Sequence, residues 1–243
     1  EFQFHKVYRS VYSFSVVELS SFYLDILKDR LYTAARTSAA RRSGQTAMLR
    51  VLDVLCRVIA PILAFTAEEV FAYLHPEESS VHAAAWPAPE EALIDEQLEK
   101  EWSALARLRE QVLKAIEEKR SAGIVGSSLE AEVVLFAPEE ETARFLKEKA
   151  AVLADVFIVS GVRIEQTMPP DDAQPVIGEG LPKSALRVQK ARGSKCPRCW
   201  HWTESVGTDP VHADVCDRCA RVLTESTKGD GNETGNAHTR KKD

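Results

Sequence analysis

Four of the five cysteines in this 243-residue chain lie close together near its end. They form two matched pairs of the type Cys-x2-Cys, Cys196 with Cys199 and Cys216 with Cys219. This spacing is typical of a four-thiolate zinc site, because each pair can direct two sulfurs at one metal ion. Four sulfurs complete a tetrahedron and leave no coordination position for water. The sequence therefore predicts one structural zinc ion with no catalytic role.

Two other kinds of chemistry use paired cysteines. Disulfides are typical of secreted proteins, but the start EFQFHKVYRS has no basic segment followed by an apolar stretch, so no signal peptide is expected. A redox Cys-x2-Cys needs one pair at a helix start, not two matched pairs. His201 and His212 are not needed as ligands, because tetrahedral zinc takes four. Cys56 is interpreted as a small buried core residue.

Basic and aromatic residues cluster around the cysteines. A small rigid module with cations and exposed rings suits single-stranded or looped nucleic acid, because cations meet phosphates and unstacked bases stack on rings. In the alternative interpretation the tryptophans cover the module's own small core, and the cations only add solubility. The residues in question include Lys190, Lys195, Arg198, Trp200 and Trp202. A second basic group, which could equally be a solvated surface, includes Arg41 and Arg42 in a connector.

Composition limits the possible functions. The chain is 44% hydrophobic and 28% charged, as expected for a globular protein of one or two domains. Its net charge of −6 does not favour nucleic acid in general, so any such contact must come from a local basic patch. No run of about 18 apolar residues is present, so no contact with a membrane is expected.

Apolar residues recur at helical spacing through the first half of the chain. Helices are expected over residues 4–32, with serines and β-branched residues weakening the pattern at 13–17, and over 45–60. Thr66 and Glu69 resemble a capping box for a short helix to Leu74. A long helix follows, which Gly123 should end.

From about residue 129 the pattern changes to strands separated by one helix. The fold class is therefore mainly α, with a helical bundle, a small α/β subdomain and a four-cysteine zinc knuckle. The tail has no apolar anchor and is expected to be disordered. The expected boundaries are 1–125 for the bundle, 126–191 for the α/β subdomain, 192–225 for the knuckle and 226–243 for the tail.

Motifs for catalysis are missing from the sequence. Neither a phosphate-binding glycine loop nor a nucleophile elbow nor a zinc-protease motif is present. The chain also begins without methionine and directly in a helical pattern. We therefore expect a binding segment cut from a longer protein, with no catalytic site of its own.

Several segments resemble, in the same order, the C-terminal region of bacterial isoleucyl-tRNA synthetases. They are FHKVYRSVYSFSVVELSSFYLDILKDRLYT, APILAFTAEEVFAYL, VSGVRI and KCPRCWHW with CDRC. The resemblance implies that the bundle, which starts after the family's first helix, holds the anticodon stem and loop of isoleucine tRNA, and that the zinc tail reaches the same loop. It carries the family's metal ligands over onto the four paired cysteines.

The resemblance also implies what the chain lacks. The catalytic domain that binds ATP and the editing domain are absent, so the parent protein would be an ATP-dependent isoleucine–tRNA ligase, while this chain supplies only tRNA recognition. The implied partners are isoleucine tRNA and the rest of the synthetase chain, in a cytoplasmic monomer.

Two other functions stay open at this point. The same cysteine spacing resembles the zinc finger of formamidopyrimidine-type DNA glycosylases, although these need an N-terminal proline and this chain begins EFQF. A zinc-stabilised protein-interaction module is the third possibility, and it would expose an apolar patch. Binding to tRNA, to duplex DNA or to neither would distinguish the three.

Overall fold

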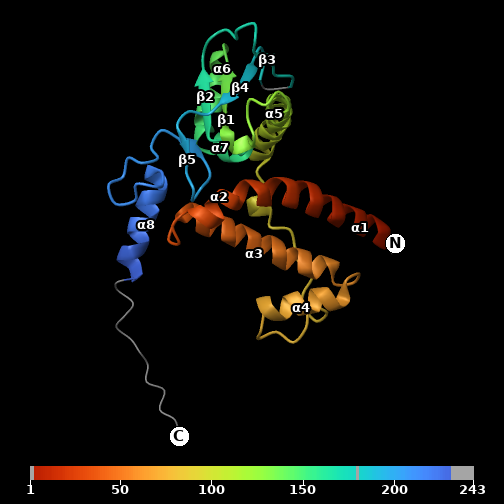
Figure 1. Cartoon of the computed structure of the whole chain (residues 1–243). Coiled ribbons are helices and arrows are strands. Elements are labelled where there is room, and N and C mark those ends of the chain that lie inside the picture. Colours follow the sequence, from red (N-terminus) through yellow and green to blue (C-terminus); the bar gives the residue numbers. More distant parts are fainter. Residues whose placement is uncertain (1–2, 179–180, 231–243) are drawn as a thin grey trace. The chain divides into compact units, whose positions relative to one another are not determined.

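Helices make up most of the first 94 residues, which form one compact unit of the computed structural model. The structure describes residues 3–178 and 181–230 (Figure 1). The elements of this first unit are α1 (Phe4–Ser13), η1 (Phe14–Leu24), α2 (Asp25–Thr33), α3 (Ala39–Ile59), α4 (Ala64–Leu74) and η2 (Glu91–Leu93).

The weak part of the first helical pattern is wound differently from its neighbours. Residues Phe14–Leu24 form a π-helix between α1 and α2, so the helix continues through this stretch without a break. The Ser21 hydroxyl donates a hydrogen bond to the carbonyl of Val16, at 2.7 Å. β-branched and serine residues disfavour the regular α-helical turn, and a π-helical segment is one way to accommodate them.

Two helix starts differ from the prediction. Helix α3 begins at Ala39, because the Ser38 side chain caps it by accepting a hydrogen bond from the Arg41 backbone N–H, at 3.4 Å. Arg41 and Arg42 therefore lie in the first turn of a helix, and their placement in a connector was wrong. Helix α4 begins at Ala64 after Leu63, which makes no side-chain cap, so the capping box at Thr66 was also wrong.

The core of the first unit lies between α3 and α4. Cys56, Ala60, Ala67 and Phe71 are buried against one another, and Val81 joins them from the following loop. The Cys56 thiol donates to the Ala67 carbonyl at 2.9 Å, which satisfies the only polar group of this side chain. Cys56 is thus a core residue, as predicted.

A four-stranded sheet forms the centre of the second unit, residues 95–243. The strands lie in the order β2-β1-β4-β3, where β1 pairs parallel with β2 and antiparallel with β4. Five of the six side chains of β1 are buried, which explains its almost continuously apolar sequence. The strands are β1 (Ala131–Phe136), β2 (Gly161–Glu165), β3 (Gln174–Pro175) and β4 (Ala185–Lys190).

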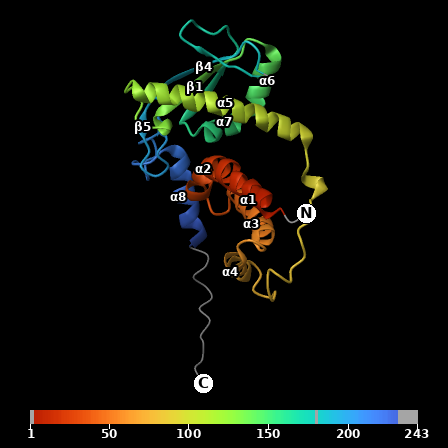
Figure 2. The same cartoon turned by 90° about the vertical axis from the view of Figure 1, so that its right-hand side faces the viewer.

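The long helix α5 (Glu96–Ser121) belongs to this sheet unit. Its apolar stripe includes Leu105 and Val112, which are buried. The helix contacts β4 and α7, and Figure 2 shows it lying along the sheet beside them. The helix ends as predicted near Gly123, which has a φ of +69°. The division between compact units thus falls at 94/95, whereas the expected bundle ran to residue 125, because α5 buries its apolar side against the sheet.

The connection from β1 to β2 contains two helices, although the sequence pattern predicted one. They are α6 (Glu140–Glu148) and α7 (Ala150–Phe157). Helix α7 ends at Phe157, and the C-cap residue Ile158 adopts a left-handed conformation with a φ of +55°. The strand expected from residue 155 therefore starts only at Gly161, because Val156 and Phe157 are buried as helical residues.

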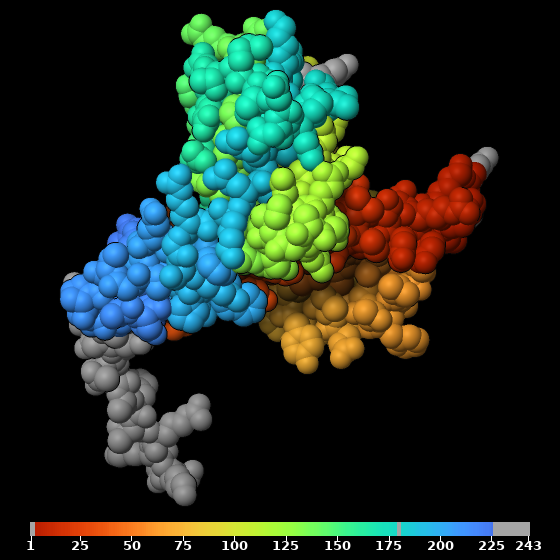
Figure 3. Space-filling model, turned by 45° about the horizontal axis from the view of Figure 1, so that its top comes forward, coloured from red at the N-terminus to blue at the C-terminus, as the bar shows by residue number. Residues whose placement is uncertain are grey.

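The segment expected to form the zinc knuckle, residues 192–225, belongs to the second unit and is called the knuckle below. It contains a two-stranded ribbon, β5 (Ser194–Lys195) and β6 (Trp202–Thr203), and most of helix α8 (Asp217–Asp230), which form the blue lobe in Figure 3. Residues 226–230 were expected to be disordered but continue α8, and residues 231–243 of the expected tail lie outside the described residues. Among the described helices none is long and apolar enough to cross a membrane.

Candidate metal centre and nucleic-acid interface

The knuckle brings the four paired cysteines together. Their sulfur atoms all lie within 4.8 Å of one another, and all four residues are buried. Cys196 and Cys199 lie in the turn after β5, and Cys216 and Cys219 lie at the start of α8. Backbone hydrogen bonds fix the first turn, since the Cys196 carbonyl accepts from the Trp200 N–H, at 2.8 Å. The turn after β5 and the start of α8 thus bring the four sulfur atoms together.

The sulfur geometry fits a tetrahedral metal. A Zn–S bond of about 2.3 Å implies a separation of about 3.8 Å between two sulfurs on a tetrahedron. The sulfurs of Cys199 and Cys216 are 3.7 Å apart, and none of the cysteines forms a disulfide. The cluster also has a small apolar surround that excludes water, to which Val206, Val215 and Leu223 contribute.

The thiols influence one another's ionisation. Burial raises the pKa of the Cys199 thiol, but hydrogen bonds from His201 and Arg218 outweigh it and lower that pKa to about 5. Burial raises the pKa of Cys216 and of Cys219, and the negative charge of Cys199 raises both further. One thiolate forms readily in this cluster, while additional thiolates require a compensating positive charge. A divalent cation supplies that charge.

The exposed face of the knuckle carries Trp200 and Lys195. The Trp200 side chain is 60% exposed, and its backbone has a φ of +66°, which is uncommon for a non-glycine residue. The Lys195 ammonium lies 5.4 Å from the centre of the Trp200 ring, within the range of a cation–π contact. A cation and an aromatic ring are therefore presented side by side, beside the metal site.

The second tryptophan connects the knuckle to the sheet. The Trp202 backbone N–H donates to the Ser160 hydroxyl at 2.7 Å, and that hydroxyl donates to the Leu129 carbonyl. The Lys190 ammonium lies 5.2 Å from the Trp202 ring centre and 2.9 Å from a Glu130 carboxylate oxygen. Trp202 and Lys190 thus already make contacts within the protein, to Ser160, to Glu130 and to each other.

The other predicted nucleic-acid contacts are distributed between the two units. The Arg198 guanidinium donates to the Cys219 sulfur at 3.4 Å, so this cation is held at the metal site. Arg41 donates to the Ala34 carbonyl at 3.1 Å and lies with Arg42 in the other compact unit. Ser160 was not predicted, because nothing in the local sequence marks a serine that receives a hydrogen bond from a residue 42 positions away.

Comparison with known proteins shows which family this arrangement belongs to. A profile described as the anticodon-binding domain of tRNA ligase matches residues 1–135. The chain belongs to this family of anticodon-binding domains. A second profile, described as a zinc finger found in FPG and IleRS, matches residues 193–222, the segment that holds the four cysteines. The zinc-finger profile alone is compatible with both kinds of protein in its description, and the profile at residues 1–135 agrees with the second kind only.

Curated relatives of this anticodon-binding domain are isoleucine–tRNA ligases. The ligase of Syntrophotalea carbinolica is 44% identical over 226 residues, which is 93% of this chain and 24% of the relative. Those of Brachyspira hyodysenteriae and Moorella thermoacetica are 41% and 40% identical, over 91% and 93% of this chain and 24% of each relative. The chain thus spans about a quarter of the length of the curated relatives it matches.

Proposed function

We propose that this chain recognises the anticodon stem and loop of isoleucine tRNA as a C-terminal part of an isoleucine–tRNA ligase. The observation that supports this most directly is the combination, in one chain, of an anticodon-binding domain with a four-cysteine cluster whose outer face presents Trp200 and Lys195. Anticodon loops have unstacked bases, which stack on aromatic rings, and closely spaced phosphates, which attract cations.

The metal in this proposal is one structural zinc ion, held by Cys196, Cys199, Cys216 and Cys219. When bound, zinc compensates the charge of the thiolates and holds the two turns together. The chain's own residues then contact the RNA. Trp200 provides a ring on which a base stacks, and Lys195 provides a positive charge for the phosphate of that nucleotide. This face is positioned by Arg198, Trp202 and Lys190, which also lie next to the RNA. In the bundle, phosphate contacts come from Arg41 and Arg42.

The division of labour in the proposal follows the expected domains. Residues 1–125 act in anticodon binding, with α5 as the part of them that packs on the sheet, while 126–191 act as a small subdomain and 192–225 as the zinc knuckle. The match of the family profile to residues 1–135 supports the first assignment, since it includes α5. ATP binding and aminoacylation belong to parts of the ligase outside this chain. The parent would act in the cytoplasm as a monomer, with isoleucine tRNA and the rest of its own chain as partners.

A gel-shift titration tests the proposal directly. The chain, loaded with zinc, is titrated into isoleucine tRNA, into an unrelated tRNA and into duplex DNA at one fixed salt concentration, because such affinities depend steeply on salt. We expect the tightest binding to isoleucine tRNA. Equal binding to both tRNAs would contradict the proposed specificity for isoleucine tRNA. Preference for duplex DNA would favour the glycosylase-like alternative.

A further inference from the structure

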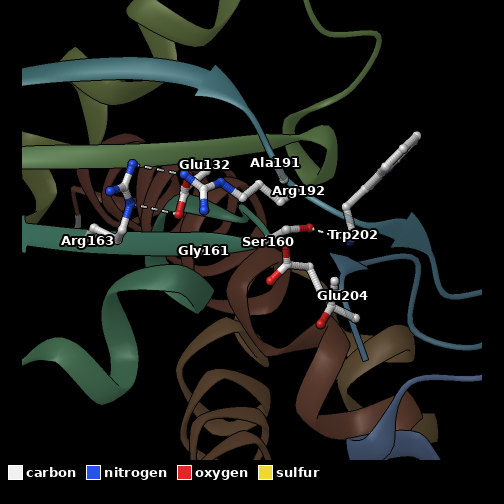
Figure 4. Close-up of a pocket in the computed structure, with 9 residues that line it drawn as sticks. Glu132, Ser160, Gly161, Arg163, Ala191, Arg192, Trp202 and Glu204 are labelled. Carbon is white, nitrogen blue, oxygen red and sulfur yellow. Dashed lines mark hydrogen bonds and ion pairs between the residues drawn. The ribbon is translucent and has the colours of Figure 1, made fainter. Parts of the chain in front are cut away.

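A hollow of about 260 Å³ lies beside the knuckle, where β6 approaches the starts of β1 and β2. It is distinct from the cysteine cluster, and polar side chains dominate its lining (Figure 4). The polar side chains that line it belong to Glu132, Ser160, Arg163, Arg192, Thr203 and Glu204.

The backbone keeps this hollow open. Gly161 forms part of its wall without a side chain, and the Trp202 ring points away from it, so neither residue fills the space (Figure 4). The hydrogen bond from the Trp202 N–H to Ser160 joins the knuckle to the sheet at its edge. The hollow is therefore a product of the docking of the knuckle on the sheet.

Two charged groups in the hollow are already used within the protein. The Arg163 guanidinium donates to both carboxylate oxygens of Glu132, at 3.0 and 3.5 Å, and Gln189 donates to the same carboxylate at 2.6 Å. Arg192 and Glu204 are exposed, and neither has a hydrogen-bond or ion-pair partner among the described residues. The hollow thus offers one unused donor group and one unused acceptor group to a ligand.

The balance of charge indicates which kind of ligand fits. Two arginines and two glutamates line the hollow, so their charges cancel. A phosphate site would show an excess of positive charge, whereas the edge of a nucleobase carries hydrogen-bond donors and acceptors together without net charge. Arg192 can donate to base oxygen or ring nitrogen atoms, and the Glu204 carboxylate can accept from an exocyclic amino group.

We propose that this hollow is a subsite for one unstacked nucleobase of the bound RNA, of a kind that carries an exocyclic amino group. The proposal rests on the proposed function and adds a second base contact to the one at Trp200. Continuity along the chain supports it: Arg192 is followed by β5, whose Lys195 lies over the Trp200 ring and pairs with Trp202 of β6. A single strand stacked on Trp200 could therefore place a neighbouring nucleotide here, as unpaired loop nucleotides do when they are splayed out.

The test compares two hollow variants with two controls, all as zinc-loaded chains. Arg192→Met and Glu204→Met remove the unused donor and acceptor groups and keep an unbranched side chain of similar length. Lys183→Met and Glu139→Met are matched controls, because these residues pair with each other at 2.7 Å beyond the opposite end of β1 and β4. Affinity for an isoleucine tRNA transcript is measured at several salt concentrations, and zinc content checks that each variant is intact.

We expect each hollow variant to weaken binding about tenfold, as for the loss of one hydrogen bond to a charged group, with an unchanged salt slope. The controls should stay within about twofold, as exposed pairs contribute little. If the wild-type chain binds and both hollow variants match it, the subsite is refuted while the proposed function stands. A salt slope reduced by about 0.7 in Arg192→Met would identify a phosphate contact and refute the base subsite. No tRNA binding by the wild-type chain would refute both proposals.

Discussion

The four paired cysteines lie so close together that the ionisation of one thiol affects the others. The negative charge of the Cys199 thiolate raises the pKa of Cys216 and of Cys219, so the metal-free cluster retains protons on buried thiols. Metal binding must displace those protons. Metal binding to this cluster is therefore expected to be coupled to the release of protons.

Cys216→Ser should release the metal and unfold the knuckle, because three thiolates do not complete the tetrahedral shell and metal-binding free energy is folding free energy in such modules. The first unit should keep its helices, since its core between α3 and α4 is separate. Metal analysis and circular dichroism measure the two effects. Cys56→Ala is the control, because it removes a buried thiol from the other unit and should leave one zinc per chain. Full zinc content in Cys216→Ser would contradict the assignment of ligands.

Acid should release the metal from the wild-type chain. Burial raises the pKa of the Cys216 thiol in the metal-free form, and the bound form requires the thiolate. The bound form therefore carries fewer protons, so its stability is greatest at high pH and falls as the pH is lowered. A zinc-sensitive dye in a pH titration would measure the release. Zinc retention independent of pH would show that the thiols do not hold it.

Trp200→Ala should weaken tRNA binding by about 1–3 kcal/mol, the usual contribution of one stacked base, and should leave zinc content unchanged. The physical reason is exposure, since Trp200 is 60% exposed and little core is lost on truncation. Trp200→Phe is the matched variant and should retain much of the affinity, because it keeps an aromatic face. Loss of zinc in Trp200→Ala would mean that the ring belongs to the knuckle's core.

At the scale of the elements, the β5–β6 ribbon depends on one glycine. Gly193 has a φ of +84°, and a Cβ atom there would lie 2.2 Å from backbone atoms of Thr203. Gly207 also has a positive φ, +89°, but the nearest atom to its Cβ position is 3.6 Å away. Substituting each glycine by alanine therefore distinguishes the cost of backbone strain alone from the cost of strain together with a steric clash.

Gly193→Ala should destabilise the second unit by more than about 2 kcal/mol, because the clash forces the ribbon strands apart in addition to the strain of a positive φ. Gly207→Ala should cost only about 1 kcal/mol, since it adds strain alone. Urea denaturation with zinc present measures both. Equal effects of the two substitutions would show that the ribbon can move to accept the side chain.

Helix α5 illustrates the limit of periodicity as a guide to packing. Its apolar stripe and its end near Gly123 follow from the sequence, but the stripe is the same whether it faces other helices or a sheet. Helix α5 contacts β4, whose buried residues Leu186 and Val188 lie about 65 residues after the end of the helix. The unit to which α5 belongs is therefore a property of the tertiary structure.

At the scale of the whole molecule, the chain should bind tRNA without activating an amino acid. It has no ATP-binding motif and spans about a quarter of its isoleucine–tRNA ligase relatives. We expect no isoleucine-dependent ATP–pyrophosphate exchange by the pure chain, with a full-length ligase as the positive control. Exchange above background, retained after further purification, would mean that the chain contains a catalytic site.

The sequence by itself determined the features that depend on local spacing. The two Cys-x2-Cys pairs, the mainly helical first half, the strand at 131–136 and the helix end near Gly123 are all encoded within a few residues of where they occur. Short-range geometry dictates them, because a turn or a helix face is set by neighbouring residues. The resemblance to isoleucyl-tRNA synthetases also follows from the order of such segments along the chain.

Only the tertiary structure decided what depends on residues far apart in the chain. Ser160 meets Trp202, α5 meets β4, and Arg192 and Glu204 line one hollow with Glu132. These pairings join residues whose separation carries no periodic signal, and they form only when apolar surface from distant elements is buried together. The hydrophobic effect that drives this burial is not directional. The apolar side of a helix or strand therefore does not indicate which other element it will pack against.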